Sequence, residues 1–382
     1  MKTVYAVWDN QNPRKSIESV RRFYMYTQLE LSNFRGFKRF SMELKPITLI
    51  AGKNNTGKTS ILEGLFLFQD YANPDVFIKL LKFRGMSQYD TSARTVWEPL
   101  FYDMDTQECL EVRLNGEFSL NLKRNNEFAL SNNALGMLDG KIDYSSVNYA
   151  LLCDFARESK RFSGNYLIGN ENMGNNLVLH GPENTSIQRN KNEEFVQYLG
   201  PHITLDEITI AEWFGQIELS RNKVDKKKLI DILAVLDEDI VDVTTIAANR
   251  LAQLYFSYSQ KEKLPIHTIG DGTKKLLHIA LVLLANPGCI LLLDEVENGL
   301  HYSLYSKFWK MISALALQEN CQIIATTHNY ECINGALEGV KAANLEESFA
   351  YVRLDKSDKG VVPKTFTCDM LERALDSDWE VR

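Results

Sequence analysis

The sequence predicts an α/β fold with a mixed sheet, and three observations support this prediction. An apolar strand at residues 47–52 precedes a glycine-containing loop and a segment with apolar residues at helical spacing. From residue 263 onward, helical and strand patterns alternate, which is typical of a parallel sheet. Period-two patterns at 27–50 and 109–130 indicate an antiparallel β subdomain. We expect the two halves of the core to be separated by a mostly helical insertion.

The expected elements follow from these patterns. Two strands lie within residues 27–44 and turn at "NFRGF"; the strand at 47–52 is apolar throughout, as in a central strand buried on both faces. A helix follows at 58–71, and the strands of 109–130 turn at "LNGE". The polar, asparagine-rich residues 163–194 predict a loop with helices after it. A further helix and two strands are expected at 226–239, 240–248 and 250–258.

We divide the chain into four parts on this basis. They are an N-terminal extension, an N-lobe, an insertion or lid region with returning strands, and a C-lobe, at residues 1–26, 27–130, 131–262 and 263–382.

Bulk composition excludes several classes of protein. The 382 residues are 45% hydrophobic and 24% charged, which fits an ordinary globular chain. No apolar run approaches the ~18 residues needed to span a bilayer, and the start lacks the apolar core of a signal peptide, so we expect a cytoplasmic protein without membrane contact. The net charge of −7 argues against a broadly basic surface but leaves a local basic groove open. Six scattered cysteines lack zinc-site spacing, so we expect free, mostly buried thiols.

The loop after the strand at 47–52 carries the first chemical motif. "AGKNNTGKTS" has the spacing GxxxxGK[ST], in which backbone N–H groups surround phosphate and the following helix adds its positive N-terminal end. We expect Lys58 to reach the β- and γ-phosphates of ATP and the Thr59 hydroxyl to bind Mg²⁺. The nucleotide-binding residues predicted here are Gly52, Asn54, Asn55, Thr56, Gly57, Lys58, Thr59 and Ser60.

Two further strand ends carry polar residues suited to the same chemistry. "CILLLDEVENGLH" ends its apolar run at Asp294 and Glu295, at the edge of a parallel sheet where ligands bind. We expect Asp294 to hold Mg²⁺ and Glu295 to activate the attacking water. "CQIIATTHN" brings His328 to the same edge, where it can contact the γ-phosphate.

The start of the long apolar helix at 270–284 has two interpretations. It is a second phosphate-facing helix start, formed by Gly270, Asp271, Gly272, Thr273 and Lys274. A nucleotide does not need two phosphate-binding helix starts from the same chain. Both starts are explained if one of them binds the nucleotide of a second subunit, which predicts a two-fold dimer. Alternatively, Asp271 simply caps the helix.

Together, "LSNFRGFKRF…ITLIAGKNNTGKTSILEGL", "GDGTKKLLHIALVLL", "LLLDEVENGLHYSL" and "ATTHNYECINGAL" resemble the ABC-type ATPases of the overcoming-lysogenization-defect and RecF/SMC group, and most of all the stand-alone bacterial AAA-family ATPases. The resemblance implies an ABC-ATPase head with a P-loop, a Walker B pair at Asp294 and Glu295, and a switch residue at His328. Residues 270–274 would be the signature motif donated in trans, and Asn298, Gly299 and Leu300 the D-loop that touches the partner.

Some residues depart from the family pattern. The signature motif is not LSGGQ, and Asn329 stands where serine is common. No glutamine is clearly placed to bind Mg²⁺, and we interpret Gln69 as a helix-end side chain. No heptad rod occurs, and Asp355 and Asp358 are interpreted as solvated turn residues rather than as part of a nuclease site.

The resemblance implies a homodimeric ATP-driven switch, open to higher assembly, that controls a nuclease or toxin supplied in trans in bacterial antiphage defence. A RecF-like DNA repair ATPase that clamps nucleic acid is the alternative, and a scaffold that binds ATP with little turnover is a third hypothesis.

Overall fold

The computed structural model describes most of the chain from residue 25 to residue 377. The described residues are 25–73, 75–89, 92–126, 149–158, 160–168, 177–180, 195–219, 223–248, 251–259, 262–358 and 360–377. The extension predicted at residues 1–26 lies almost entirely outside them.

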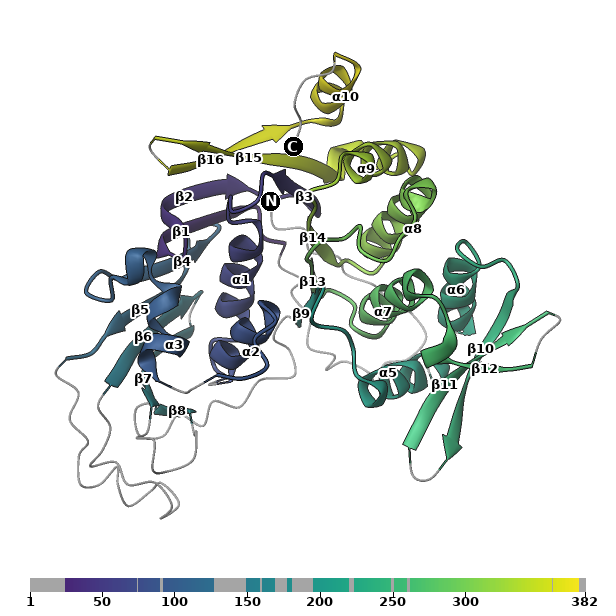
Figure 1. Ribbon diagram of the computed structural model, residues 1–382, viewed down its shortest axis with the longest axis horizontal. Helices are drawn as coiled ribbons and strands as arrows, with labels where there is room; N and C mark the ends of the chain where they lie inside the picture. The colour runs from purple at the N-terminus through teal and green to yellow at the C-terminus, as the bar shows by residue number, and fades with distance from the viewer. Residues whose placement is uncertain are drawn as a thin grey trace, which may run out of the picture.

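A six-stranded sheet forms the centre of the molecule (Figure 1). Its order is β16-β15-β3-β14-β13-β9, and all neighbouring strands are parallel except β15 and β16. The strands are β3 Ile47–Gly52, β9 Val196–Leu199, β13 Ile290–Leu293, β14 Gln322–Thr326, β15 Phe349–Ser357 and β16 Gly360–Phe366. Every residue of β3 is buried, which confirms the prediction of a central strand.

A second, antiparallel sheet has seven strands in the order β2-β1-β4-β5-β6-β7-β8. Its strands are β1 Gln28–Phe34, β2 Phe37–Glu43, β4 Leu110–Leu114, β5 Phe118–Arg124, β6 Tyr149–Arg157, β7 Lys160–Ile168 and β8 Leu177–His180. The predicted turns after β1 and β4 are confirmed. The sheet continues past residue 131, where we had placed a domain boundary, and that division stays a prediction.

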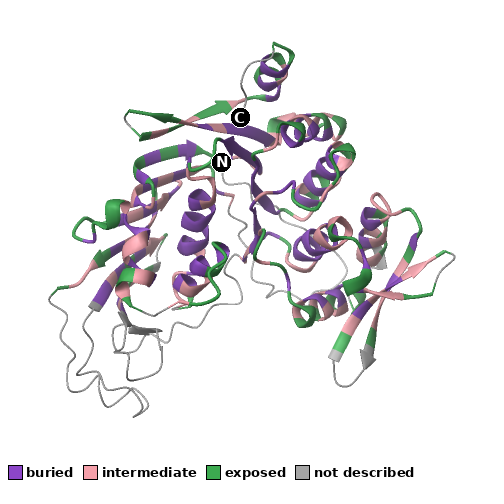
Figure 2. Ribbon diagram, viewed as in Figure 1, coloured by how far each residue is buried: buried purple, intermediate pink, exposed green. Residues whose placement is uncertain are grey.

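Helix α1 (Lys58–Gln69) lies between the two sheets and is almost wholly buried (Figure 2). One hydrophobic cluster joins its Leu62 to Leu31 of the seven-stranded sheet and to Leu292 of the six-stranded sheet. Helix α2 (Val76–Phe83) packs in the same layer.

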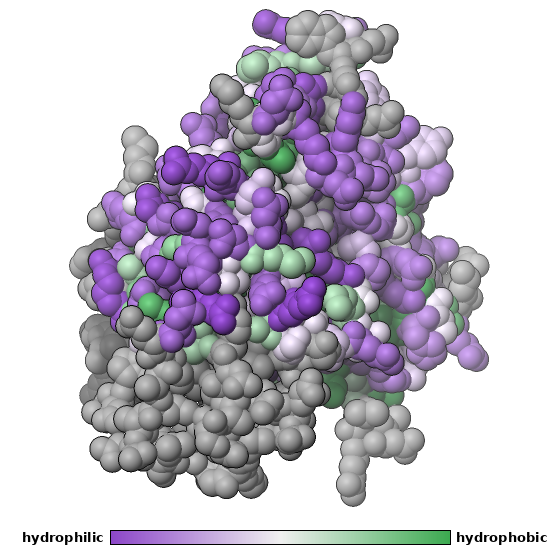
Figure 3. Space-filling view, turned by 60° about the vertical axis from the view of Figure 1, so that its left-hand side comes forward, coloured by the Kyte–Doolittle hydropathy of each residue, from purple (hydrophilic) through white to green (hydrophobic). Residues whose placement is uncertain are grey.

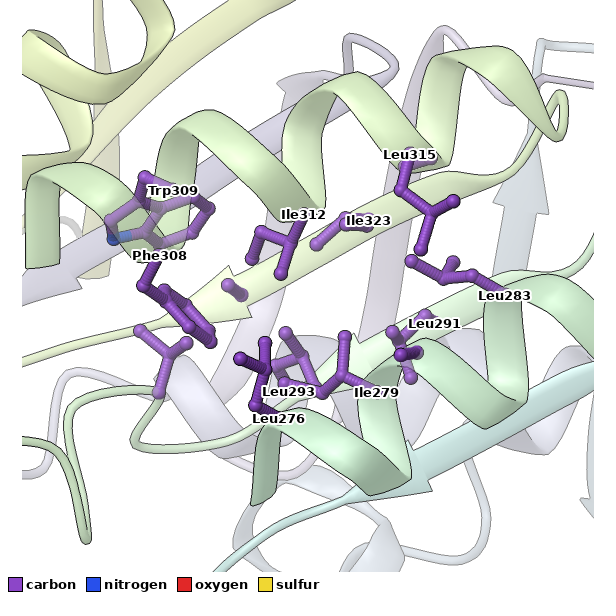
Figure 4. Close-up of a cluster of buried hydrophobic side chains, with 14 of the residues drawn as sticks. Leu276, Ile279, Leu283, Leu291, Leu293, Phe308, Trp309, Ile312, Leu315 and Ile323 are labelled. Atoms are coloured by element: carbon purple, nitrogen blue, oxygen red, sulfur yellow. The ribbon is translucent and has the colours of Figure 1, made fainter. Parts of the chain in front are cut away.

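The opposite face of the six-stranded sheet is covered by α7 (Asp271–Ala285), α8 (Tyr305–Gln318) and α9 (Tyr330–Ala342). Because side chains alternate along a strand, Leu291 and Leu293 point to this face while Leu292 points to α1. Figure 4 shows α7 and α8 contributing Ile279 and Ile312 to the resulting cluster.

The insertion contains more strand than the sequence predicted. Between residues 131 and 262, the described residues form strands β6 to β11 and the helices α5 (Glu207–Leu219) and α6 (Lys223–Leu233). Strand β11 (Leu251–Tyr258) pairs with β10 (Ile240–Ala248) and with the short β12 (Leu264–Pro265) in a separate sheet beside α5. The prediction of a mostly helical insertion was therefore wrong.

The predicted loop at 163–194 is also partly wrong. Residues 163–168 belong to β7 and residues 177–180 form β8, and the remainder lies outside the described residues. Glycine and asparagine lower the local strand propensity, but pairing with β6 and complete burial of Tyr166 outweigh it.

The C-terminal end forms the β15–β16 hairpin and the helix α10 (Cys368–Asp376). Asp355 lies within β15 and pairs with Arg353 and Lys364, so its interpretation as a solvated turn residue was wrong. Of the six free cysteines, only Cys109 is exposed.

Polar side chains cover most of the described part of the face shown in Figure 3. Within the described ranges, no helix has the length and apolar character needed to cross a membrane.

Candidate nucleotide-binding site

The loop of residues 53–57 connects the buried strand β3 to α1 and turns back on itself. Asn55 and Gly57 have positive φ angles of 62° and 91°. A Cβ atom at Gly57 would lie 2.4 Å from the Phe37 ring, so this position requires glycine for both backbone conformation and space. The Thr56 hydroxyl donates to the Lys53 carbonyl at 2.9 Å and closes the loop.

Lys58, at the start of α1, points back into this loop. Its Nζ donates to the carbonyl oxygens of Gly52 at 2.7 Å and Lys53 at 3.2 Å. Burial lowers the pKa of Lys58, and the negative charges of Asp294, Glu297 and Glu295 oppose that shift. The ammonium therefore lies near Asp294 and Glu295, which the sequence analysis expected at a strand end, and near Glu297.

Thr59 and Asp294 meet although 235 residues separate them. The Thr59 hydroxyl donates to Asp294 Oδ2 at 2.9 Å, and Asp294 is 6% exposed. The contact follows from the topology, because β3 and β13 both flank β14 and end at the same sheet edge. A hydroxyl and a carboxylate are the oxygen ligands that Mg²⁺ prefers, so these two residues fit the metal assigned to them.

Two other hydroxyl groups also donate to Asp294. Tyr198, on β9, donates to Oδ2 at 2.9 Å, and Thr326, at the end of β14, donates to Oδ1. The Tyr198 ring stacks on Phe83 with centroids 3.7 Å apart. Burial and the adjacent Asp294 raise the pKa of Tyr198. The sequence analysis missed Tyr198, whose only local signal is the short run "VQYL" in a polar region.

Glu295 begins a tight turn directly after Asp294. Its φ angle is 48°, and its N–H group donates to Thr326 Oγ1 at 3.0 Å. Its side chain accepts a hydrogen bond from Asn298 Nδ2 at 2.7 Å. Lys275 of α7 donates to the carbonyl oxygens of Glu295 at 3.1 Å and Asn298 at 2.9 Å, and burial lowers the pKa of Lys275 to about 8.

His328 follows β14 and contacts a carboxylate that the sequence analysis did not single out. Glu297 Oε1 accepts the His328 backbone N–H at 2.9 Å and lies 3.1 Å from His328 Nδ1. Asn329 caps α9, because its side chain accepts from the Cys332 N–H group at 2.8 Å.

The segment 270–274 forms the start of α7. Gly270 is the N-cap residue and no side chain caps the helix, so the alternative that Asp271 is the cap was wrong. Asp271 instead accepts from Lys274 at 3.4 Å. A Cβ atom at Gly272 would lie 2.7 Å from the Gly299 carbonyl oxygen, so this helix start packs directly on the segment 298–300.

Gln69 is the last residue of α1, and its Nε2 donates to the Tyr26 hydroxyl at 2.5 Å. This agrees with its interpretation as a helix-end side chain.

The strand–loop–helix around Lys58 and the strand end at Asp294 define a P-loop ATPase fold. Two family models match the chain: "AAA ATPase domain" at residues 25–207, and "AAA domain, putative AbiEii toxin, Type IV TA system" at residues 158–334. Both models describe AAA-type ATPase domains, and together they match the chain over residues 25–334.

Among curated proteins, the chain is similar to an "ATP/GTP phosphatase" of Helicobacter pylori, with 22% identity over 93% of this chain and 99% of the relative. It is also 34% identical to an uncharacterized protein of Methanocaldococcus jannaschii, over 32% of this chain and 57% of that protein.

Two solved SMC head domains overlap with the chain. The head from Pyrococcus furiosus, bound to the C-terminal domain of ScpA, has a TM-score of 0.49 at 13% identity, over 92% of this chain and 99% of that one. The head from Thermotoga maritima has a TM-score of 0.41 at 10% identity, over 90% and 99% of the two chains.

Proposed function

We propose that this ATPase is a dimeric switch in which two copies enclose two ATP molecules. The observation that carries the proposal is the 2.9 Å contact between Thr59 and Asp294, because it joins the phosphate loop to the strand end that carries Glu295. Gly52 to Ser60 would surround the phosphates. Thr59 and Asp294 would hold Mg²⁺, which neutralises phosphate charge when it is bound.

Each remaining residue has a role in hydrolysis under this proposal. Lys58 would leave the carbonyl oxygens of its own loop and contact the β- and γ-phosphates. Glu295 would accept a proton from the attacking water, and its strained backbone would hold the carboxylate beyond the strand end. His328 would contact the γ-phosphate and respond to its release.

The dimer would use the surface formed by the start of α7 and the segment 298–300. Gly272 and Gly299 are packed together, so the two segments would approach a partner's nucleotide as one unit. Tyr302, shortly after this segment, is 65% exposed and is available to the same interface. Asp271, Thr273 and Lys274 would then complete the partner's site.

We further propose that the switch regulates a nuclease or toxin encoded separately, in bacterial antiphage defence. The matching model whose description names a putative toxin of a type IV TA system supports a role in a toxin-based system. Adding the product of a neighbouring gene to the pure chain should change the phosphate-release rate. If duplex DNA alone changed the phosphate-release rate, and if this effect weakened with added salt, a RecF-like clamp would be favoured instead.

The catalytic assignment is tested with Glu295→Gln. We expect this variant to bind ATP, to lose turnover by at least about a hundredfold, and to remain dimeric with ATP in light-scattering measurements. Glu331→Gln, an exposed glutamate at the start of α9, is the matched control and should behave as the native chain. Turnover that survives in Glu295→Gln would refute the role of Glu295, and a monomer with bound ATP would refute the shared site.

A further inference from the structure

Glu297 is a buried carboxylate that the proposed reaction does not use. It is 5% exposed, and its Oε2 atom has no hydrogen-bond partner among the described residues. Burying a carboxylate is costly unless opposing charges and N–H donors offset the cost. The His328 main-chain N–H donates to Glu297, the His328 ring nitrogen Nδ1 lies 3.1 Å from it, and Lys275 and Lys58 supply positive charge nearby. If the side chain at this position only filled space, an uncharged side chain would do so with a smaller desolvation cost.

The contact with His328 is made twice through the same oxygen. Glu297 Oε1 accepts the His328 main-chain N–H at 2.9 Å and lies 3.1 Å from the ring nitrogen Nδ1. Binding the backbone and the ring of one residue together restricts both the position and the rotation of the imidazole. The ring is otherwise weakly confined, because the His328 side chain is 50% exposed.

The chemistry of the pair also selects a tautomer. An ionised carboxylate can only accept hydrogen bonds, so the Nδ1 atom that contacts it must carry a proton. The second ring nitrogen, Nε2, then remains for a ligand. Without a carboxylate at this position, neither the tautomer nor the direction of Nε2 would be determined by the protein.

We propose that Glu297 is a positioning residue that holds His328 by its Nδ1–H group and so directs Nε2 at the γ-phosphate, to which Nε2 donates a hydrogen bond once it also carries a proton. The part concerning the γ-phosphate rests on the proposed function, whereas the tautomer is a property of the free chain. Glu297 joins the turn after β13 to the loop after β14, so it also links the strand end that bears Glu295 to the histidine that would contact the phosphate.

The tautomer is tested by NMR of the full chain labelled with ¹⁵N-histidine. The chain has six histidines, and the spectrum of His328→Gln identifies the signals of His328. We expect Nδ1 to be protonated in the native chain and the population to move toward the Nε2-protonated form in Glu297→Gln. An Nε2-protonated ring in the native chain, or identical spectra for His328 in both proteins, would overturn the proposal.

The coupling to turnover is tested by a double-mutant cycle. We expect Glu297→Gln to lower kcat on the order of tenfold with little change in KM for ATP, and His328→Gln to lower kcat at least as much. The double variant should be no slower than His328→Gln alone, because Glu297 acts through His328. Additive losses would indicate a merely structural Glu297, and an unchanged kcat in Glu297→Gln would also overturn the proposal.

These outcomes are distinct from a failure of the proposed function. If Glu295→Gln retained turnover while the histidine spectra followed expectation, the reaction scheme would fail and the Glu297–His328 pair would stand. If the native spectra lacked Nδ1 protonation while Glu295→Gln lost turnover, the opposite conclusion would hold.

Discussion

At the scale of single residues, Asp294 organises the site. Hydroxyl groups from Thr59, Tyr198 and Thr326 donate to its two oxygens, and these residues come from α1, β9 and β14. A carboxylate held from three directions has little freedom to rotate, which prepares it to bind a metal ion without reorganisation. Tyr198 is the donor best suited to a test, because removing its hydroxyl leaves the ring in place.

Tyr198→Phe should weaken metal binding while the fold is retained. The stacking on Phe83 would remain, but Asp294 would lose one of the groups that orient it. We expect the Mg²⁺ concentration for half-maximal ATPase activity to rise by about tenfold. A magnesium titration at saturating ATP measures this.

Tyr351→Phe is the matched control, because Tyr351 is a buried tyrosine on β15. A similar loss in both variants, or no loss in Tyr198→Phe, would show that the hydroxyl contact with Asp294 does not support the metal.

At the scale of elements, the start of α7 and the turn after β13 form one unit. Gly272 packs on Gly299, and Lys275 donates to two carbonyl oxygens of the same turn. A displacement of either segment would therefore move the other and would change the position of Glu295. This arrangement gives a direct physical route between the proposed interface and the proposed catalytic base.

Gly272→Ala should disturb this unit. The added Cβ atom would lie 2.7 Å from a backbone oxygen, so the segment must shift, at a cost of about 1–3 kcal/mol in the free energy of unfolding. We expect a lower melting temperature and a reduced ATPase rate.

Gly215→Ala, within α5, serves for comparison because no atom lies within 4 Å of its added Cβ. It should keep the native melting temperature or raise it slightly. Equal melting temperatures for Gly272→Ala and the native chain would contradict the close packing of α7 on the turn.

At the scale of the whole molecule, α1 is the layer that joins the two sheets. Its Glu63 is fully buried and accepts hydrogen bonds from Arg35, in the turn between β1 and β2, and from Arg84, after α2. Arg84 also donates to Ser60 at 3.1 Å. The ion pairs of Glu63 with Arg35 and Arg84 therefore connect the antiparallel sheet to the helix that follows the phosphate loop.

Glu63→Ala should destabilise the chain by about 3–5 kcal/mol, because it leaves the buried Arg35 without its carboxylate. Glu372→Ala breaks the exposed pair with Lys341 and should have a much smaller effect, because solvent screens that pair. Urea unfolding of both variants measures the difference. Comparable effects would show that the buried cluster does not hold the layers together.

The sequence by itself determined the parts of this protein that are written in contiguous residues. The strand, loop and helix at 47–69 were predicted because their spacing, glycines and apolar periodicity are local properties. The position of Asp294 was predicted for the same reason, because the apolar run "CILLL" stops directly before it and so indicates the end of a strand. The meeting of Asp294 with Thr59 was expected because parallel strands end at one edge.

The tertiary structure alone decided the partners of these residues. Tyr198 reaches Asp294 across 96 positions, and Glu297 reaches His328 across 31. Neither "VQYL" nor "VEN" carries a local pattern for such a contact, and β7 formed against its own propensity. Strand pairing and burial are set by distant segments, so their energies outweigh local preferences only after the sheets assemble.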